Sequence, residues 1–247
     1  MSIDTHLGKP STSLWNQMHW QPSARQLQQF IKLQSLLCYW NKQVNLTRLI
    51  NGNDYWIAQI YDSLWPLKKE LKTPGKSLNC IDIGSGCGFP GLAVAIALPK
   101  CKVTLVDSLS RKTKILQKIS KSLGLCSQIK VCTNRAEVLG QKSNYRGQFD
   151  LAMARAVANA SVVSEYLVPL LKSNGEAFIY KGKVDEKEQK ALEAALEALN
   201  SKIKSIETTK LPENKGERLL LKVIQNGKCP DKYPRSIGIP TKRPLGS

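Results

Sequence analysis

Short apolar runs alternate with helical patterns from residue 78 onward. The runs that we predict as strands cover residues 78–83, 102–107, 129–132, 149–154 and 176–181. Between them, apolar positions recur every three or four residues, which indicates amphipathic helices. Strands that alternate with helices form a parallel sheet with helices on both faces. The pattern therefore predicts an α/β domain.

Two further strands follow without a helix between them. Residues 202–208 and 218–225 are joined by a polar loop that is too short for a crossover helix. Strands connected in this way pair as an antiparallel hairpin. We therefore expect a seven-stranded, mostly parallel sheet with one antiparallel strand.

Helical patterns precede the sheet. Ser23 is a candidate N-cap for a helix whose apolar positions extend to Trp40. A second helix is predicted from about Asp54 to Leu64, where Pro66 interrupts it. This part of the chain is expected to pack as a helical extension beside the sheet.

The same patterns suggest a division of the chain. Residues 1–22 are polar and look loosely ordered, and the turn at 73–75 closes the helical part. We predict a helical extension (1–76), a central domain (77–226) and a basic, proline-rich tail (227–247) that should be extended.

The first predicted strand runs into a glycine-rich turn, Gly84-Ser85-Gly86-Cys87-Gly88, and a helical pattern follows. Glycines accept positive φ angles and let a ligand approach the backbone. Open α/β sheets bind ligands at the carboxyl ends of their strands. We interpret the turn as a ligand site.

The glycines can be read in two registers. Gly84, Gly86 and Gly88 give G-x-G-x-G, the spacing typical of S-adenosylmethionine sites. Taken with Gly91, the last two also give G-x-G-x-x-G, the dinucleotide fingerprint. The terminal hairpin favours the first register, and so does Pro90, because it removes an N–H that a pyrophosphate would use.

Asp107 ends the second predicted strand. A carboxylate at this position can accept hydrogen bonds from ribose hydroxyls in either register. The alternative is an N-cap of the next helix, a role that Ser108 could fill equally well.

Charge is the strongest compositional signal. The chain has 37 Lys and Arg against 19 Asp and Glu, a formal net charge of +18. Residues 5–53 and 108–136 contain no acid, and the acids gather between 185 and 217. A one-sided positive field is typical of a phosphate-backbone partner. A generally basic proteome or an anionic membrane surface would also account for the charge.

One predicted helix concentrates this charge. After Asp107, basic side chains fall on one helical face and apolar side chains on the opposite face. The basic set is Arg111, Lys114, Lys118 and Lys121, and the apolar set is Ile115, Leu116, Ile119 and Leu123. The basic face is either a phosphate contact or an ordinary solvated surface. Solvated faces usually mix signs, and this one has no acid.

Metal and membrane signals are weak. The seven cysteines are scattered without a C-x-x-C pair, and His6 and His19 are the only histidines. We therefore expect no metal site. The sequence contains no long apolar run and no signal-peptide pattern, so we expect a cytoplasmic protein, and we predict a monomer.

Several motifs together resemble one family. The glycine loop through Gly91 is similar to that of the small-subunit ribosomal RNA guanine-N7 methyltransferases, the glucose-inhibited division protein B or RsmG family. Further resemblances lie at Asn45-Leu46-Thr47, Leu105-Val106-Asp107-Ser108, Arg135-Ala136-Glu137, Ala154-Arg155-Ala156, Lys181-Gly182, Gly216-Glu217-Arg218 and 233–245. The resemblance spans roughly residues 25–246. It implies a Rossmann-like class I methyltransferase that acts on 16S rRNA of the 30S subunit with S-adenosylmethionine as cofactor.

The pattern and the resemblance give candidate site residues. The cofactor candidates are Gly84, Gly86, Gly88, Phe89, Asp107, Ser108, Leu109, Ala136, Glu137 and Arg155. The RNA candidates are Arg111, Lys114, Lys118, Lys121, Lys181, Arg218, Arg235, Lys242 and Arg243.

The chain departs from the family at two positions. Gln59 stands where the family usually has a histidine, and this puts any role of that histidine in doubt. Cys87 stands where alanine or proline is common, a change that should only reshape the turn.

Methylation at N7 needs little acid–base chemistry, because the N7 lone pair of guanine is free. This agrees with the lack of histidine beyond residue 19. Catalysis would come from alignment of N7 with the methyl carbon and from fixed charges. Asp62 and Arg155 are the candidate catalytic residues. Arg155 could instead form a salt bridge with Asp82 or Asp107.

Other functions are compatible with the same sequence. A non-catalytic RNA- or ribosome-binding factor could keep the same fold, and an NAD(P)-dependent reductase would fit the second glycine register. Methyl transfer to a small molecule would leave the charge of +18 unexplained.

Overall fold

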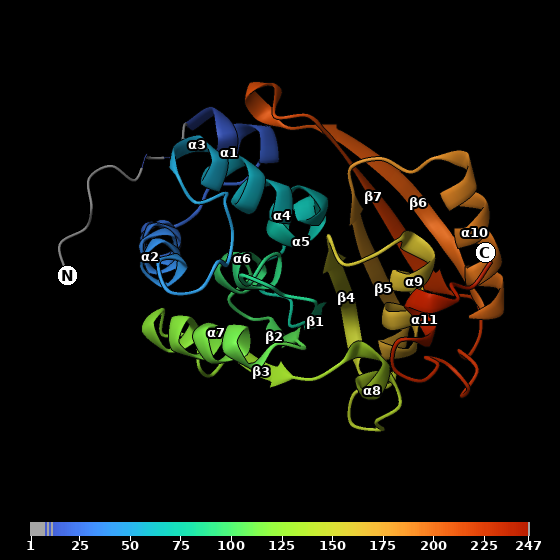
Figure 1. Ribbon diagram of the computed structural model, residues 1–247. Helices are drawn as coiled ribbons and strands as arrows, with labels where there is room; N and C mark the ends of the chain where they lie inside the picture. The colour runs from blue at the N-terminus through green and yellow to red at the C-terminus, as the bar shows by residue number, and fades with distance from the viewer. Residues whose placement is uncertain (1–7, 9, 11, 247) are drawn as a thin grey trace.

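A single mixed sheet forms the centre of the computed structural model, which describes residues 8, 10 and 12–246 (Figure 1). Its strands lie in the order β3-β2-β1-β4-β5-β7-β6. Their bounds are β1 (Asn79–Ile83), β2 (Lys102–Asp107), β3 (Ile129–Thr133), β4 (Phe149–Arg155), β5 (Leu171–Lys181), β6 (Ser201–Lys210) and β7 (Glu217–Gln225). β7 runs antiparallel to both β5 and β6, and the other pairs are parallel. The predicted hairpin and single antiparallel strand are confirmed.

Alternate residues of the strands face two hydrophobic cores. In β1, for example, Cys80 packs into one core and Ile81 into the other. A strand that is buried on both faces needs apolar residues at successive positions, which explains the unbroken apolar runs of the sequence.

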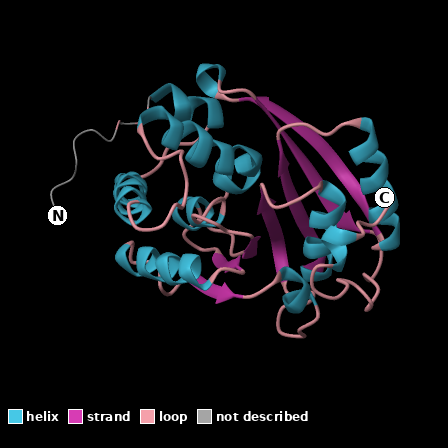
Figure 2. Cartoon of the chain, in the orientation of Figure 1, coloured by secondary structure: helices cyan, strands magenta, loops and turns pink. Residues whose placement is uncertain are grey.

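Helices cover both faces of the sheet (Figure 2). One face carries the N-terminal helices together with α6 (Gly91–Ala97) and α7 (Ser110–Ser122). The other carries α8 (Ala136–Gly140), α9 (Ala160–Leu167) and α10 (Glu186–Ala198). The α/β architecture expected from the pattern is therefore present.

The N-terminal helices pack on α6 and share its core. They are α1 (Thr12–Met18), α2 (Ala24–Asn41), α3 (Gly52–Tyr55), a π-helix (Trp56–Tyr61), α4 (Asp62–Leu64), a 3₁₀ turn (Trp65–Leu67) and α5 (Lys68–Lys72). Ser23 caps α2 through a capping box with Gln26, as its sequence position predicts. The aromatic side chains of Tyr55, Trp56 and Tyr61 are buried.

The expectation of a loosely ordered N-terminus is wrong for part of that segment. Residues 12–18 form α1, because Leu14, Trp15 and Met18 are buried against the helices that follow. Residues 1–7, 9 and 11 lie outside the described part of the chain.

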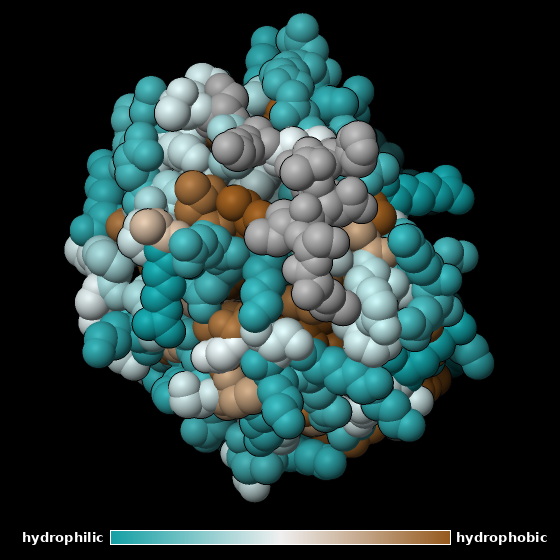
Figure 3. Space-filling view, turned by 90° about the vertical axis from the view of Figure 1, so that its left-hand side faces the viewer, coloured by the Kyte–Doolittle hydropathy of each residue, from teal (hydrophilic) through white to brown (hydrophobic). Residues whose placement is uncertain are grey.

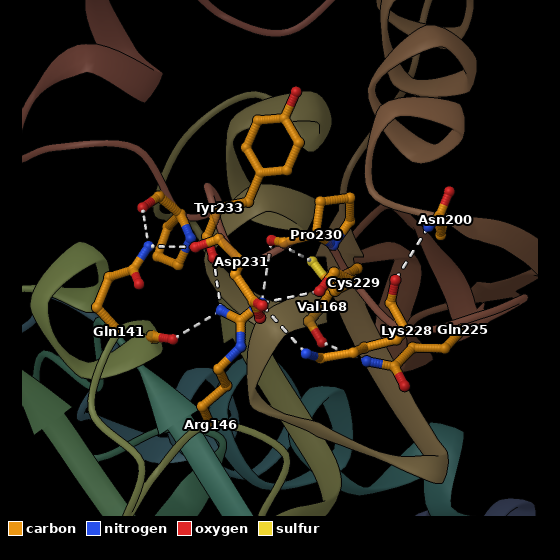
Figure 4. A network of polar contacts seen from close by, with 12 residues as sticks. Gln141, Arg146, Val168, Asn200, Gln225, Lys228, Cys229, Pro230, Asp231 and Tyr233 are labelled. Atoms are coloured by element: carbon orange, nitrogen blue, oxygen red, sulfur yellow. Dashed lines mark hydrogen bonds and ion pairs between the residues drawn. The ribbon is translucent and has the colours of Figure 1, made fainter.

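The tail is also not extended. It turns back over α8 and α9, with Cys229 and Tyr233 buried, and forms the short helix α11 (Ile239–Lys242). Figure 4 shows the guanidinium of Arg146 donating to backbone carbonyls of this segment. The tail thus folds against the domain because one arginine supplies several donors to its carbonyl groups.

Candidate active site

A cavity of about 600 Å³ opens at the carboxyl ends of β1, β2, β4 and β5. The glycine turn forms one wall, and the loop after β4 with the end of β5 forms another. The N-terminal helical part closes the third side with Leu46, Thr47, Leu49, Ala58, Gln59 and Asp62. This is the edge at which open α/β sheets hold their ligands.

The glycine turn is bonded to β2 by Ser85. The Ser85 backbone N–H donates to Val106 O over 2.9 Å, and its hydroxyl accepts the Val106 N–H over 3.0 Å. Three glycines in the turn have positive φ: 71° at Gly84, 56° at Gly86 and 102° at Gly88. The turn needs glycine at these positions because L side chains rarely adopt such angles.

Gly84 and Gly86 differ in the space that a Cβ atom would have. A Cβ on Gly84 would lie 2.6 Å from Val157 Cγ2, which packs over the turn. A Cβ on Gly86 would meet only Gly84 O, at 3.7 Å. Gly86 therefore leaves room where its backbone faces the cavity.

Asp107 links the turn to the second strand. Its Oδ2 accepts the Gly86 N–H over 3.0 Å, and its Oδ1 accepts the Leu109 N–H over 2.9 Å. The side chain is buried yet borders the cavity. A carboxylate has about four acceptor positions, so capacity remains for ligand hydroxyls.

The alternative role of Asp107 is partly realised. Its bond to Leu109 satisfies one N–H at the start of α7, whose N-cap is Leu109 itself. Ser108, which the sequence offered as an equally good N-cap, does not cap this helix.

Arg155 ends β4 and is held by one turn of the N-terminal helical part. Its Nη1 donates to Asp62 Oδ2 over 3.0 Å and to Ala58 O over 2.9 Å. Its Nη2 donates to Gln59 Oε1. The guanidinium also lies 5.7 Å from the centre of the Phe89 ring. The salt bridge considered from sequence forms with Asp62 and not with Asp82 or Asp107.

Asp62 pairs with a second arginine. Its Oδ1 lies 3.3 Å from Arg218 Nε, an ion pair without hydrogen-bond alignment, so Oδ1 accepts no hydrogen bond among the described residues. The carboxylate therefore sits between two guanidinium groups from β4 and β7. Burying an unpaired charge is costly, and this pairing offsets the cost.

Asp82 lies directly beneath the turn. Burial raises the pKa of this carboxyl to about 6, although the Gly91 N–H and the charge of Arg155 oppose the shift. Its Oδ2 accepts the Gly91 N–H over 2.9 Å, which ties the turn to the start of α6.

Comparison with known proteins identifies the family. A family model described as rRNA small subunit methyltransferase G matches residues 26–219. The chain belongs to the ribosomal RNA small subunit methyltransferase G family.

Members of the ribosomal RNA small subunit methyltransferase G family match nearly the whole chain. One from Prochlorococcus marinus strain NATL2A is 54% identical over 94% of this chain and 94% of its own length. One from Prochlorococcus marinus strain MIT 9313 is 51% identical over 100% of both. The resemblance inferred from the motifs is confirmed.

A solved structure supports the fold. The 1,6-didemethyltoxoflavin-N1-methyltransferase of Burkholderia thailandensis superposes with a TM-score of 0.51, at 14% identity, over 84% of this chain and 93% of that one. The chain therefore has the Rossmann-like methyltransferase fold that its sequence predicted.

The predicted cofactor residues fall into two groups in this family member. Gly84, Gly86, Phe89, Asp107 and Arg155 line the cavity. The others do not line it: Gly88, Ser108, Leu109, Ala136 and Glu137. Cofactor contact by any of these residues stays a prediction.

Glu137 has a partner that the sequence did not indicate. Its Oε1 accepts the Gly238 N–H over 3.0 Å, so the tail lies against α8. A Glu137 that holds the tail can still border the cofactor, and this contact stays a prediction.

The predicted RNA residues are likewise divided. Arg111, Lys114, Lys118 and Lys121 are exposed on α7, opposite the buried Ile115, Leu116, Ile119 and Leu123, so the predicted helical faces are confirmed. Figure 3 views the side of the molecule on which α2 and α7 lie in Figure 1, and this face is largely hydrophilic.

Other RNA candidates already have partners. Arg235 forms a bidentate pair with the buried Glu165, with a shortest contact of 2.7 Å. Lys181 Nζ lies 2.7 Å from Glu188 Oε1, and Arg218 pairs with Asp62. Lys242 and Arg243 lie at the end of α11.

Several cavity residues were not predicted as site residues, although Gln59 was named as a departure from the family pattern. Thr47, Gln59, Lys112, Val157 and Lys183 line the cavity. The first two come from segments distant in sequence from the glycine turn, and only the N-L-T resemblance pointed toward Thr47. Ala156, with a φ of 56°, is a non-glycine in the left-handed region directly after Arg155, which no sequence pattern indicates.

None of the described helices is long and apolar enough to cross a membrane. The described residues also contain no group of three or more His, Cys, Asp or Glu side chains placed to hold a metal ion.

Proposed function

We propose that this protein transfers a methyl group from S-adenosylmethionine to N7 of a guanine in 16S rRNA of the small ribosomal subunit, in the cytoplasm. The observation that carries the proposal is the turn Gly84–Gly88, hydrogen-bonded to Asp107 at the carboxyl edge of the sheet. It occurs in a chain that belongs to an rRNA methyltransferase family.

The residues present fit the cofactor. Gly86 leaves open space toward the cavity, and Asp107 keeps acceptor positions suited to ribose hydroxyls. S-adenosylmethionine supplies an electrophilic methyl group on a sulfonium centre. The glycine turn and Asp107 would hold it, and the apolar ring of Phe89 would border it.

The remaining cavity residues suit an N7 acceptor. N7 carries a free lone pair, so the site needs no general base and no metal-activated group. Arg155 and Asp62 provide fixed charges whose positions do not depend on the ligand, because three acceptors hold the guanidinium. Such preorganised groups lower a barrier without reorganisation during the reaction.

The exposed basic face of α7 would contact RNA phosphates. Its four cations carry no acidic neighbour on the same helix. Lys112 and Lys183 extend positive charge to the cavity wall. The protein would act as a monomer on this substrate.

Methyl transfer can be tested directly with labelled S-adenosylmethionine and 30S subunits that lack the modification. We expect label in 16S rRNA from the wild-type protein and background label from Arg155→Ala. Calorimetry provides the second arm. If S-adenosylmethionine does not bind while RNA does, the protein is a binding factor, and the enzymatic proposal fails.

A further inference from the structure

We propose that Gln59 is a positioning residue that fixes the guanidinium of Arg155 inside the cavity. The inference rests on the proposed methyl transfer and deepens it, because it names the side chain that sets the geometry of the site.

The donors of Arg155 can be counted. Both N–H groups of Nη1 go to Asp62 and Ala58, and one N–H of Nη2 goes to Gln59. Among the described residues, nothing accepts from Nε–H or from the second Nη2–H. Arg155 lines the cavity, so this edge of the guanidinium is the part left for a ligand.

Gln59 is the one described side chain that holds the Nη2 side of that edge. Asp62 and Ala58 both accept from Nη1, so neither of them contacts the Nη2 side of the guanidinium. The Gln59 contact anchors the plane at Nη2, next to the N–H groups that remain for a ligand.

The amide of Gln59 is itself fixed. Its Nε2 donates to Thr47 Oγ1 over 3.1 Å, and the side chain is buried. Asn41 Oδ1 in turn accepts the N–H groups of Leu46, at 2.7 Å, and Thr47, at 3.0 Å. A continuous chain of hydrogen bonds therefore runs from the end of α2 to the end of β4.

The chemistry of the amide suits this place. Gln59 must accept from Arg155 and donate to Thr47 at the same time, and a carboxamide does both without ionising. An imidazole can do both only in its neutral form. A protonated imidazole has two donors and no acceptor, so it would face the guanidinium with like charge.

The ionisable groups around Gln59 come from four elements. They are Arg155 on β4, Asp62 on α4, Arg218 on β7, and Cys87 in the glycine turn, with Asp82 and Lys112 beyond it. Burial raises the pKa of the Cys87 thiol, so it stays neutral near pH 7. Asp82 is present in wild type and in all Gln59 variants. The effect of its ionisation on kcat therefore cancels in the ratio of two proteins.

The first test removes the hydrogen bonds of the Gln59 side chain to Arg155, Thr47 and Cys87 and puts a side chain of similar length in its place. Gln59→Met should lower kcat on 30S subunits by about tenfold or more, with the KM for S-adenosylmethionine within about twofold of wild type. Gln34→Met is the matched control, because Gln34 is a buried glutamine that donates to Ile50 O, away from the cavity. Equal kcat losses in the two variants would overturn the proposal.

A double-mutant cycle tests whether Gln59 acts through Arg155. In an Arg155→Lys background the guanidinium is gone, so Gln59→Met should change kcat by less than about twofold. Losses that multiply instead would show that Gln59 acts independently of Arg155, and the inference would be wrong.

A pH profile of Gln59→His separates positioning from packing. The ratio of its kcat to that of wild type should be constant above pH 8 and fall about tenfold per unit below the imidazole pKa of roughly 6.5. A ratio that is flat from about pH 5.5 to 8.5, on either side of that pKa, would contradict the proposal.

A readout that does not depend on activity keeps this inference separate from the proposed function. The Nη2 group of Arg155 should rotate slowly in wild type, as seen by ¹⁵N exchange spectroscopy with the resonance assigned through Arg155→Lys, and faster in Gln59→Met, whereas Asp62 and Ala58 hold Nη1 in both proteins. If wild type labels no RNA, the proposed function fails while this measurement still decides the role of Gln59. Equal rotation rates in both proteins would overturn that role.

Discussion

Gly84 is constrained both by its backbone and by the side chain over it. Its φ of 71° is rarely adopted by L side chains, and Val157 Cγ2 occupies the place of a Cβ. Val157 belongs to the loop after β4, so the glycine turn packs directly against that loop at Gly84. A side chain at this position would push the two walls of the cavity apart.

The first prediction concerns this contact between the turn and the loop. Gly84→Ala should lower the free energy of unfolding by about 1–3 kcal/mol, from left-handed strain, and should weaken S-adenosylmethionine binding because Val157 must shift. Chemical denaturation and calorimetry measure the two effects. Gly75→Ala is the control, since a Cβ there meets nothing within 4 Å, and it should stay within about 0.5 kcal/mol of wild type. Unchanged cofactor affinity in Gly84→Ala would show that this contact does not affect the cofactor site.

The second prediction follows from Asp82, whose folded-state pKa of about 6 lies above the ordinary value of 3.8. The folded protein therefore binds more protons than the unfolded chain between pH 4 and 6, and this carboxyl lowers stability as pH rises through that window. Its contribution becomes constant about one pH unit above the folded-state pKa of about 6.

Asp82→Asn removes this titration. The difference in unfolding free energy between variant and wild type should become more favourable to the variant by about 2.5 kcal/mol from pH 4 to pH 8. Denaturation curves at several pH values would test this. A difference that is independent of pH would show that Asp82 has an ordinary pKa in the folded protein.

The sequence predicted the site residues that lie next to a local signal. Gly84, Gly86 and Asp107 were found because glycine spacing and strand ends mark them. Thr47 lies in the N-L-T resemblance and Gln59 at a departure from the family pattern, but neither signal showed their link to Arg155. That link depends on how the N-terminal helical part docks on β4. The periodic pattern of apolar residues predicts single elements, but it does not indicate which distant segments dock on each other.

At the scale of elements, a charged side chain of the domain, Arg146, binds the C-terminal tail. Arg146 donates to the carbonyl groups of Gly140, Cys229, Pro230 and Tyr233, and lies 3.6 Å from Asp231. Figure 4 shows these contacts converging on one guanidinium. The proline content suggested an extended tail, but it could not reveal that an arginine far earlier in the chain binds its carbonyls.

The third prediction tests the hydrogen bonds between Arg146 and the tail. Arg146→Met should speed hydrogen exchange of amides in residues 229–243, because carbonyls that had charged donors lose them, at a local cost of about 2–4 kcal/mol. Arg25→Met, at an exposed position on α2, is the control and should leave the tail unchanged. Equal protection of the tail amides from hydrogen exchange in both variants would show that Arg146 does not hold the tail.

The elements themselves were largely predictable. The strands and the hairpin fall within a few residues of their predicted positions, except that β5 already begins at Leu171. The π-helix Trp56–Tyr61 was expected only as ordinary helix, because its apolar pattern does not distinguish the two. It presents Ala58 and Gln59 to Arg155.

Across the whole molecule, positive charge extends from the exposed face of α7 to the cavity. The charged residues on that face are all basic, and the cavity holds two buried carboxylates, Asp62 and Asp107, beside five basic side chains: Lys112, Arg155, Lys181, Lys183 and Arg218. The surface charge favours a polyanionic substrate.

The fourth prediction concerns this surface. Lys114→Glu with Lys121→Glu should raise the KM for 30S subunits and flatten its salt dependence, because fewer counterions are released on binding. Affinity for S-adenosylmethionine should not change. Lys187→Glu with Lys190→Glu, on exposed positions of α10, is the matched control with the same change in net charge. Equal KM shifts in the two double variants would show that only net charge matters.

The glycine turn, on our proposal, holds the methyl donor for a guanine N7 in 16S rRNA. Nucleoside mass spectrometry of 16S rRNA can decide this, after unmodified 30S subunits have reacted with the wild-type protein and S-adenosylmethionine. We expect 7-methylguanosine at a single position, and none with Arg155→Ala. Methylation of another atom, or no methyl transfer to 16S rRNA, would contradict the proposal.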